Sequence, residues 1–292
     1  MSIPNIQEML DAGVHFGHLT KRWNPKMRKY ILTERNGIYV LDLDKTQACL
    51  QRAVEAVRRL RQQGRPVLFV GTKKTLKDCL KEEAMRCGQF YVTERWLGGM
   101  LTNFPTVRKS IKRLEEIEKM EAEGVFKDLS KKEVLGLNKE HAKLDGIFSG
   151  IRNMKTLPGA LFVSDTEHEH IAVHEANRLN IPVIGIVDTN SNPDQIAFPI
   201  PGNDDAAKAI RLVVEVLSQA VQNGLARRKV DANPRKTESY TGQINSQWSP
   251  DFRTEATVSY TTFDGSPRNA GTPYPQVQVQ GISGKRLDTG AT

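Results

Sequence analysis

Short, uninterrupted runs of Val, Ile, Leu and Phe alternate with amphipathic stretches over residues 1–228, and this alternation restricts the folds open to the chain. The runs lack the polar alternation of a strand that faces water on one side, so they suit strands covered on both faces. Five strands are expected, over residues 37–43, 66–70, 90–92, 160–163 and 182–187. Helical periodicity between them, as over residues 75–87, 167–179 and 204–221, predicts an α/β fold with a doubly wound parallel sheet.

The stretch between the third and fourth predicted strands is too long for a simple crossover helix. Residues 105–154 carry two narrow apolar stripes on charged helices, formed by Val107, Ile111, Leu114 and Ile117 and by Leu137, Leu144, Phe148 and Ile151. Such stripes are typical of an antiparallel coiled-coil helical hairpin, which would protrude from the sheet domain. Arg108 and Lys109 open its first helix, so the base of the hairpin is basic.

The last 64 residues differ in composition from the rest of the chain. They contain only seven Ile, Leu, Val or Met and are rich in Gly, Pro, Ser, Thr, Asn and Gln. Such a segment cannot bury enough apolar surface to offset its chain entropy, so residues 229–292 are expected to be a disordered, low-complexity C-terminal extension. Its aromatic residues and the strand-like segments TVSYTTF and QVQVQ indicate that it becomes ordered against a partner. The predicted domains are therefore residues 1–228 and 229–292.

The charge of the chain indicates a polyanionic partner. Lys plus Arg number 42 against 34 Asp plus Glu, a formal net charge of +8, and residues 229–292 carry seven basic and six acidic residues. Residues 1–228 therefore hold 35 basic and 28 acidic residues, or +7. The N-terminus lacks the regions of a signal peptide, no apolar run is long enough for a membrane span, and the three cysteines show no CxxC spacing. These features argue against secreted, membrane and disulfide-rich proteins.

The first basic cluster lies in residues 13–30, GVHFGHLTKRWNPKMRKY, which contain no acidic residue. Lys21, Arg22 and Lys26 can neutralise phosphates. Trp23, beside the turn-forming Asn24, can stack on a base or ribose. The pattern predicts a nucleic-acid contact, and the alternative is a solvated basic loop in which Trp23 fills the core.

Two more basic loops follow predicted strands. In the motif GTKKT, Lys73 and Lys74 lie between a strand and a helix N-terminus, where backbone N–H groups favour an anion. The motif lacks the GxxxxGK[ST] spacing of a phosphate-binding loop, so contact with an RNA phosphate is favoured over nucleotide binding. In the motif ERWLGGMLTNFP, Arg95 and Trp96 precede a Gly-Gly pair that permits close backbone approach, with a structural elbow as the alternative.

His18 and three aspartates form a candidate metal site. Asp188 ends a predicted strand, and Asp204 and Asp205 begin the last predicted helix. The carboxyl ends of the strands meet at one edge of a doubly wound sheet, so these groups are expected to converge and to suit a divalent ion, zinc or magnesium. The alternative is that Asp204 or Asp205 simply caps the helix.

No motif for catalysis is present in the sequence. GxSxG and SxxK are missing, no GxGxxG follows a predicted strand, and no acidic pair has a clear acid-base placement. His168, His170 and His174 are expected to be structural or solvent-facing, because HExxH is absent. A non-enzymatic protein without a required cofactor is favoured over a doubly wound enzyme that uses a nucleotide or sugar phosphate.

Several motifs, in order and spacing, resemble the bacterial and organellar type of the small-subunit ribosomal protein two family: HFGH, RWNPKM, FVGTKK, RWLGGMLTNF, LPGALFVSDTEHEHIAVHEANRLNIPVIGIVDTN and FPIPGNDDA. The resemblance covers roughly residues 1–225. It implies a flavodoxin-like sheet with a protruding coiled-coil hairpin, and a structural role on small-subunit rRNA at the junction of head and body. It also implies contact with neighbouring ribosomal proteins, including the large first-numbered protein that captures mRNA for translation.

The same resemblance implies which residues face rRNA. They are Lys21, Arg22, Asn24, Lys26, Lys73, Lys74, Arg95, Trp96, Asn103 and Arg108, to which the residue pattern adds Trp23 and Lys109. The expected location is the ribosome, in a bacterial cytoplasm or as an organelle-encoded chain, with no membrane contact and no small-molecule substrate. The extension has no counterpart in the short members of the family, so the resemblance assigns it no task.

Overall fold

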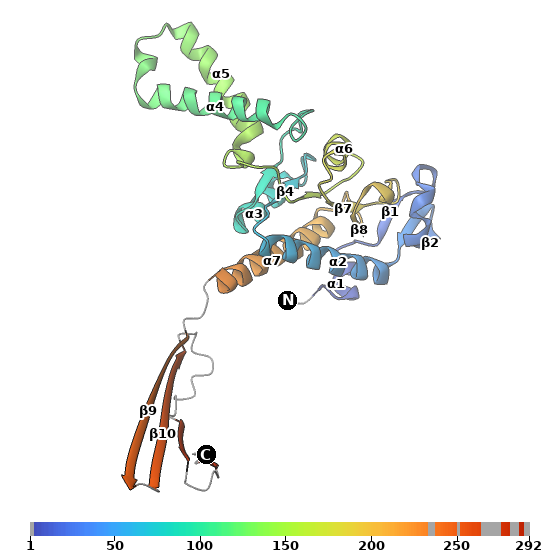
Figure 1. The fold of residues 1–292 in the computed structure, drawn as a ribbon. Coiled ribbons are helices and arrows are strands. Elements are labelled where there is room, and N and C mark those ends of the chain that lie inside the picture. The colour runs from blue at the N-terminus through green and yellow to red at the C-terminus, as the bar shows by residue number, and fades with distance from the viewer. Residues whose placement is uncertain (1–2, 233–236, 250–251, 264–275, 281–285, 289–292) are drawn as a thin grey trace. The chain divides into compact units, whose positions relative to one another are not determined.

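Five parallel strands form the central sheet in the computed structural model, which describes residues 3–232, 237–249, 252–263, 276–280 and 286–288. The strands are β4 (Val67–Val70), β5 (Phe90–Val92), β6 (Ala160–Val163), β7 (Val183–Val187) and β8 (Phe198–Pro201), in the order β5-β4-β6-β7-β8. Counted along the chain, this is the order 2-1-3-4-5 of flavodoxin-like sheets. The predicted doubly wound, flavodoxin-like parallel sheet is confirmed (Figure 1).

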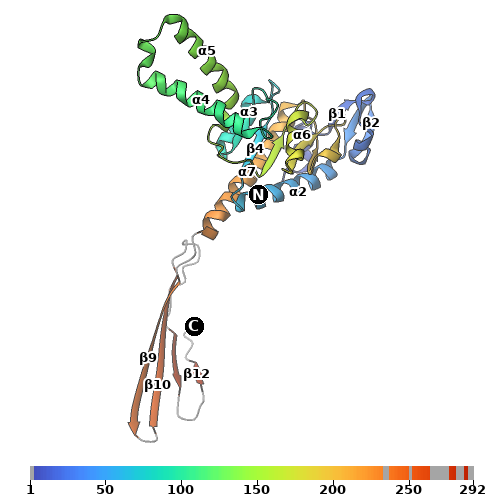
Figure 2. The same ribbon diagram turned by 45° about the horizontal axis from the view of Figure 1, so that its top comes forward.

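Helices cover both faces of the central sheet (Figure 2). One face carries α2 (Leu43–Gln62), α3 (Lys77–Arg86) and α7 (Ala207–Ala232), and the other carries α6 (His170–Arg178). Alternate residues of a strand enter opposite cores: Val67 and Phe69 of β4 pack against α2, α3 and α7, whereas Leu68 and Val70 pack on the α6 side. Because both faces are removed from water, these strands are uninterrupted apolar runs in the sequence.

The strand expected over residues 37–43 lies outside the parallel sheet, and this corrects the prediction. A separate three-stranded antiparallel sheet contains β1 (Phe16–Leu19), β3 (Ile38–Leu41) and β2 (Ile31–Arg35) in that order. Asn36 and Gly37 form the two-residue turn between β2 and β3, with φ of 52° and 74°. An Asn-Gly turn with positive φ favours a tight antiparallel hairpin, and this local signal determines how the apolar run pairs.

The fifth parallel strand is β8, which the apolar runs did not predict. Its sequence is FPIP, so Pro199 and Pro201 interrupt the pattern by which the other strands were recognised. β8 lies at the edge of the sheet, and β7 is its one partner among the described strands. An edge strand tolerates proline, because the missing N–H group can face away from the ladder.

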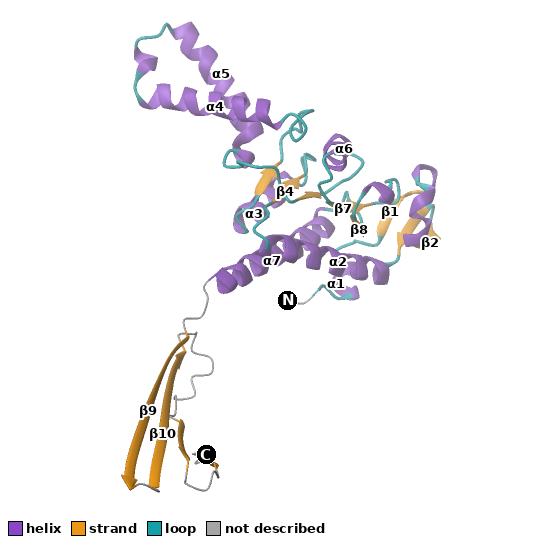
Figure 3. Cartoon of the chain, viewed as in Figure 1, coloured by secondary structure: helices purple, strands orange, loops and turns teal. Residues whose placement is uncertain are grey.

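The predicted helical hairpin is present between β5 and β6 (Figure 3). It consists of α4 (Phe104–Ala122) and α5 (Lys131–Phe148). Ile111, Leu114 and Ile117 of the first predicted stripe are at most 1% exposed, so the stripe forms the seam between the helices. The guanidinium of Arg113 pairs with the Glu140 carboxylate across the hairpin, with an Nε–Oε1 distance of 3.1 Å.

Shorter elements complete the N-terminal unit, which spans Met1–Lys229. They are α1 (Ile6–Asp11) and the short 3₁₀ helices η1 (Thr20–Arg22), η2 (Pro25–Tyr30), η3 (Val125–Lys127), η4 (Ser149–Ile151) and η5 (Pro193–Gln195). Asn5 caps α1 through a reciprocal hydrogen-bonded box with Glu8, which fixes where the helix begins. None of the described helices is long and apolar enough to cross a membrane.

The second unit spans Val230–Thr292 and contains a four-stranded antiparallel sheet. Its strands are β9 (Thr237–Ser249), β10 (Phe252–Phe263), β11 (Gln276–Gln280) and β12 (Arg286–Asp288). The segment TVSYTTF lies in β10 and QVQVQ is β11, so both strand-like segments are strands. That this extension becomes ordered only against a partner stays a prediction.

Candidate functional site

The predicted basic loops gather at the carboxyl ends of the parallel strands, here called the carboxyl edge. Lys74 follows β4 and Arg95 follows β5. The first loop reaches the same edge by docking on the segment after β7. The backbone N–H of His18 donates to Oγ1 of Thr189 at 2.8 Å, and that of Asn24 donates to the Thr189 carbonyl at 2.7 Å. Hydrogen bonds between distant segments therefore bring three basic loops to one edge of the sheet.

Five of the predicted basic side chains are exposed and form no ion pair within the described part of the chain. They are Lys21, Arg22, Lys74, Arg95 and Lys109. Lys26 is also about half exposed, and its ammonium lies 2.8 Å from a carboxylate oxygen of Asp194. Surface pairs of this kind contribute about 0–1 kcal/mol, so Lys26 can exchange its partner at little cost. The carboxyl edge thus presents positive charge that the protein itself does not neutralise.

Two other predicted residues of the first loop shape it from within. Trp23 is half-buried, and its ring centroid lies 5.1 Å from that of Tyr39 in a tilted arrangement. The Asn24 side chain accepts a hydrogen bond from the backbone N–H of Lys26 at 3.0 Å and so begins η2. The loop is therefore anchored by Trp23 and held in a defined turn by Asn24.

At the base of the hairpin, Asn103 and Arg108 also make internal contacts. Oδ1 of Asn103 accepts a hydrogen bond from the Thr106 hydroxyl at 2.9 Å, at the start of α4. Nη1 of Arg108 donates to the carbonyl oxygens of Arg152 at 3.0 Å and Met154 at 3.3 Å. Arg108 therefore ties the beginning of α4 to the segment that leaves the hairpin.

Trp96 is buried, with 7% of its surface exposed. Its indole N–H donates to Oε1 of Glu175 at 3.1 Å, and the backbone N–H of Gly99 donates to the same oxygen at 2.7 Å. The N–H groups of Leu101 and Thr102 donate to Oε2, each at 2.9 Å. One carboxylate of α6 thus organises the whole Trp-Leu-Gly-Gly loop.

The charge of Glu175 is stabilised by these contacts. Burial opposes ionisation, but the hydrogen bonds from the backbone of Thr102, Gly99 and Leu101 outweigh it and lower the pKa of Glu175. Sequence reasoning missed this residue, although it lies inside the longest of the motifs that resemble the family. Its partners are more than 70 residues away in the sequence, so no local pattern reveals the contact.

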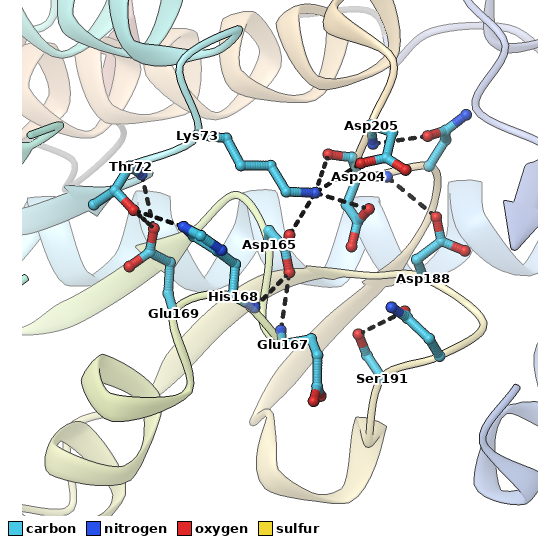
Figure 4. Close-up of polar contacts among 12 residues, drawn as sticks. Thr72, Lys73, Asp165, Glu167, His168, Glu169, Asp188, Ser191, Asp204 and Asp205 are labelled. Atoms are coloured by element: carbon cyan, nitrogen blue, oxygen red, sulfur yellow. Dashed lines mark hydrogen bonds and ion pairs between the residues drawn. The ribbon is translucent and has the colours of Figure 1, made fainter. Parts of the chain in front are cut away.

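Lys73 points into a cluster of aspartates at the carboxyl edge (Figure 4). Its ammonium lies 2.6 Å from Asp165, 2.8 Å from Asp205 and 3.3 Å from Asp204. Burial opposes the charged form, but the hydrogen bonds to Asp165 and Asp205 and the charge of Asp204 together raise the pKa of Lys73. The sequence grouped Lys73 with Lys74, whereas Lys73 is neutralised within the chain.

The four predicted metal ligands lie close together. Nδ1 of His18 is 3.1 Å from Oδ2 of Asp188, and Nε2 of His18 is 3.5 Å from Oδ2 of Asp205. Ligand atoms of His18, Asp188 and Asp204 all lie within 4.8 Å of one another, the one such group of three found among the described residues. His168, His170 and His174 are instead exposed on and beside α6.

Asp204 is the most constrained member of this group. It is 1% exposed, and its Oδ2 atom is buried without a hydrogen-bond partner. Burial and the charges of Asp165 and Asp188 raise the pKa of Asp204 to about 7. The hydrogen bond to Asp188 raises the pKa of His18 to about 9, although burial opposes this. The cluster therefore contains a buried oxygen that no described residue satisfies with a hydrogen bond.

Comparison with known proteins gives a consistent family. The family model described as "Ribosomal protein S2" matches residues 9–224. Two relatives are 54% identical over 221 residues, which is 76% of this chain and 76% of each relative. Both are named "Small ribosomal subunit protein uS2", one from Treponema pallidum subsp. pallidum and the other from the Nichols strain of Treponema pallidum. The chain, with its flavodoxin-like sheet, helical hairpin and basic carboxyl edge, belongs to the ribosomal protein S2 family.

Proposed function

We propose that this protein is a structural constituent of the small ribosomal subunit that binds small-subunit rRNA through its carboxyl edge and hairpin base. The observation that carries the proposal is the set of exposed cations without an ion pair among the described residues, Lys21, Arg22, Lys74, Arg95 and Lys109. Cations that form no internal ion pair neutralise RNA phosphates without first losing a partner. The relatives' names and the shared family support a place in the small ribosomal subunit. The family resemblance implies that the contact lies at the junction of head and body.

A nucleotide-binding enzyme is the competing function for this fold. In doubly wound sheets, ligands bind where the strand order reverses, here between the loops after β4 and β6. Asp165 and Asp204 occupy this place around Lys73, so a nucleotide phosphate would meet carboxylates. We expect a thermal-shift screen with nucleotides to show no stabilisation, and a concentration-dependent rise in melting temperature would support the enzyme instead.

The rRNA contact is tested by changing Lys21 and Arg22 together to Ala. Both side chains are exposed, so the fold should remain while affinity for small-subunit rRNA falls and occupancy in small subunits decreases. The slope of log affinity against log salt should shrink by about 0.7–0.9 for each phosphate that is no longer neutralised. The control changes Arg52 and Lys81, exposed basic residues of α2 and α3, to Ala. Equal affinity and occupancy in the two double variants would remove the first loop from the interface.

The proposed role includes docking of a neighbouring protein, the large mRNA-capturing one that the resemblance implies. Ile6, Leu10 and Leu32 are 40%, 40% and 67% exposed and line one cavity of about 310 Å³. Exposed apolar side chains that share a hollow are typical of protein-docking surfaces. Leu32→Ser should weaken binding of that protein and leave rRNA affinity unchanged. The control is Met85→Ser at a residue 61% exposed on α3, and equal binding by both variants would rule out this surface.

We also propose that His18, Asp188 and Asp204, with Asp205 beside them, hold a divalent ion. An imidazole and carboxylates are a donor set that suits zinc. Oδ2 of Asp204, which is buried and has no hydrogen-bond partner among the described residues, can coordinate the ion. The ion would tie the first loop to the segments after β7 and before α7 and so position the basic residues.

The metal proposal is tested by calorimetric titration of the purified protein with zinc and, separately, magnesium. Asp204→Asn should weaken binding by more than the roughly 10–100-fold that loss of an outer-shell partner causes. Asp194→Asn, at an exposed aspartate of the same edge, is the control. Unchanged affinity in Asp204→Asn, or no binding of either ion by the wild type, would contradict the proposal.

A further inference from the structure

A second cationic site lies at the amino ends of the parallel strands, opposite the carboxyl edge. Two of its arginines come from the end of α2 and two from the end of α7, helices that lie side by side in both views (Figures 1 and 2). They form what we call the arginine cluster: Arg58, Arg61, Arg227 and Arg228. Since α2 ends five residues before β4 begins, its last turns lie beside the start of the strands.

Close packing of α7 on α2 brings these side chains together. A Cβ added at Gly224 would lie 2.8 Å from the Arg58 carbonyl oxygen and 2.6 Å from Cβ of Arg61, so only glycine allows this approach. Arg227 and Arg228 follow Gly224 by three and four positions and share its face of α7. A Cβ added at Gly64 would lie 2.6 Å from the Arg228 guanidinium, which therefore covers the turn after α2.

No carboxylate of the described residues neutralises this cluster. Within the described residues, none of the four guanidinium groups pairs with a carboxylate, and the nearby Glu55 pairs with Arg59 at 3.6 Å. Arg61 is 7% exposed, and its Nε is buried without a partner, as is Nε of Arg58. Burial and the charge of Arg228 lower the pKa of Arg61.

Helix ends explain only part of this arrangement. Arginine near a helix C-terminus interacts favourably with the helix dipole, and Nη1 of Arg61 donates to the Arg65 carbonyl at 2.7 Å. Neither contact gives the two unpartnered Nε groups an acceptor. A buried donor and an unpaired charge each cost stability. The exposed guanidinium groups of Arg227 and Arg228, which have no carboxylate partner among the described residues, are the members of the cluster that an external anion can reach.

The surroundings of the cluster indicate which anion it takes. Arg58 and Arg227 line a cavity of about 430 Å³. Its other walls include apolar Ile3, Val54 and Ala220 and the polar side chains of Gln51 and Glu55, of which Glu55 pairs with Arg59. We propose that the arginine cluster binds the phosphates of a single RNA strand, with a base or ribose in this cavity. Guanidinium groups bind phosphate oxygens in pairs, and a nucleotide supplies both the anion and the flat, less polar body that the cavity accommodates.

The proposal extends the rRNA-binding function and depends on it only for the source of the RNA. The test measures the affinity of the full chain for a fluorescent oligouridine. The chain carries Lys21→Ala and Arg22→Ala throughout, so that the first loop does not contribute to binding. Adding Arg58→Gln and Arg227→Gln should weaken binding by about tenfold or more and lower the salt slope by about 0.7 for each phosphate released from the cluster. Arg59→Gln, at the arginine paired with Glu55, is the matched control. Arg61 is kept so that the core is undisturbed, and equal melting temperatures verify the fold.

Crosslinking with 4-thiouridine in the same oligonucleotide should label peptides that contain Arg58 or Arg227. Affinity equal to that of Arg59→Gln, or crosslinks only at the carboxyl edge, would overturn the proposal. Competition by an oligoglutamate of equal charge, at equal affinity, would assign the cluster to an acidic protein segment instead and overturn it as well. This assay contains no ribosome. A negative result here would therefore contradict only the arginine-cluster proposal, because the proposed function is tested separately by occupancy in small subunits.

Discussion

At the scale of single residues, the carboxyl edge depends on a few buried charges that position many exposed ones. Glu175 accepts hydrogen bonds from five donors of the loop that carries Arg95. Lys73 pairs with three aspartates from two segments. These internal contacts leave the charges of Arg95 and Lys74 facing outward. Arg95 and Lys74 therefore supply the exposed positive charge, whereas Glu175 and Lys73 hold the loops that carry it in place.

Glu175→Gln should destabilise the N-terminal unit by about 3 kcal/mol, because an amide leaves buried N–H donors facing an NH₂ group. Urea unfolding measures this free energy, with Glu167→Gln, at an exposed residue just before α6, as the control. The pKa of Glu175 is lowered from its ordinary value of 4.5, so its stabilising contribution is present above that pH and is lost as the pH falls further. The difference between wild type and variant should shrink accordingly, and a pH-independent difference would contradict the assigned charge.

Composition and motifs predict which basic residues lie near the carboxyl edge, but not which of them form ion pairs within the protein. Lys73 and Lys74 are neighbours with the same chemistry, and only contacts with residues more than 90 positions away separate their roles. The indole N–H of Trp96 donates to Glu175, a contact that the loop's own sequence does not reveal, and the expected contact of Trp96 with RNA stays a prediction. Ion pairs and burial arise from the tertiary fold, so the sequence of a loop does not contain them.

At the scale of elements, patterns of burial were predictable and patterns of pairing were less so. Apolar runs identified four of the five parallel strands, and the stripe from Val107 to Ile117 identified the hairpin seam. The apolar run at residues 37–43 predicts a strand of the parallel sheet, but the Asn36-Gly37 turn pairs it with β2 in the antiparallel sheet instead. The prolines of β8 concealed an edge strand.

Leu114→Ala tests whether the hairpin folds as a unit on its apolar seam. Leu114 is 0% exposed, so its truncation should cost about 2–5 kcal/mol and remove amide protection throughout α4 and α5. Hydrogen exchange measures this, and protection of β4 and β6 should be unchanged. The control is Leu135→Ala, at a residue of α5 that is 55% exposed. Equal loss of protection in the hairpin and the sheet would show that the two unfold together.

At the scale of the whole molecule, positive charge is divided between two ends of one sheet domain. The carboxyl edge carries exposed cations beside a cluster of aspartates, and the arginine cluster lies at the opposite ends of the strands. Of the formal charge of +8, +7 belongs to residues 1–228. Two cationic surfaces at opposite ends of the strands are what the proposed RNA contacts require.

Removal of residues 233–292 tests how the C-terminal extension relates to this domain. The truncation begins after α7 ends at Ala232, so the core of the N-terminal unit is complete. We expect the same melting temperature and rRNA affinity as in the full chain, and rapid amide exchange over β9 to β12 in the free protein. Loss of amide protection in α2 or α7 on truncation would instead make the extension part of the domain's fold.

The most direct test of the central claim is a density map of small ribosomal subunits purified from cells that express this chain. The proposed function predicts that Lys21, Arg22, Lys74 and Arg95 lie within hydrogen-bond distance of rRNA phosphates, with the hairpin base against the same RNA. A map in which the carboxyl edge faces solvent, or from which the chain is absent, would contradict it.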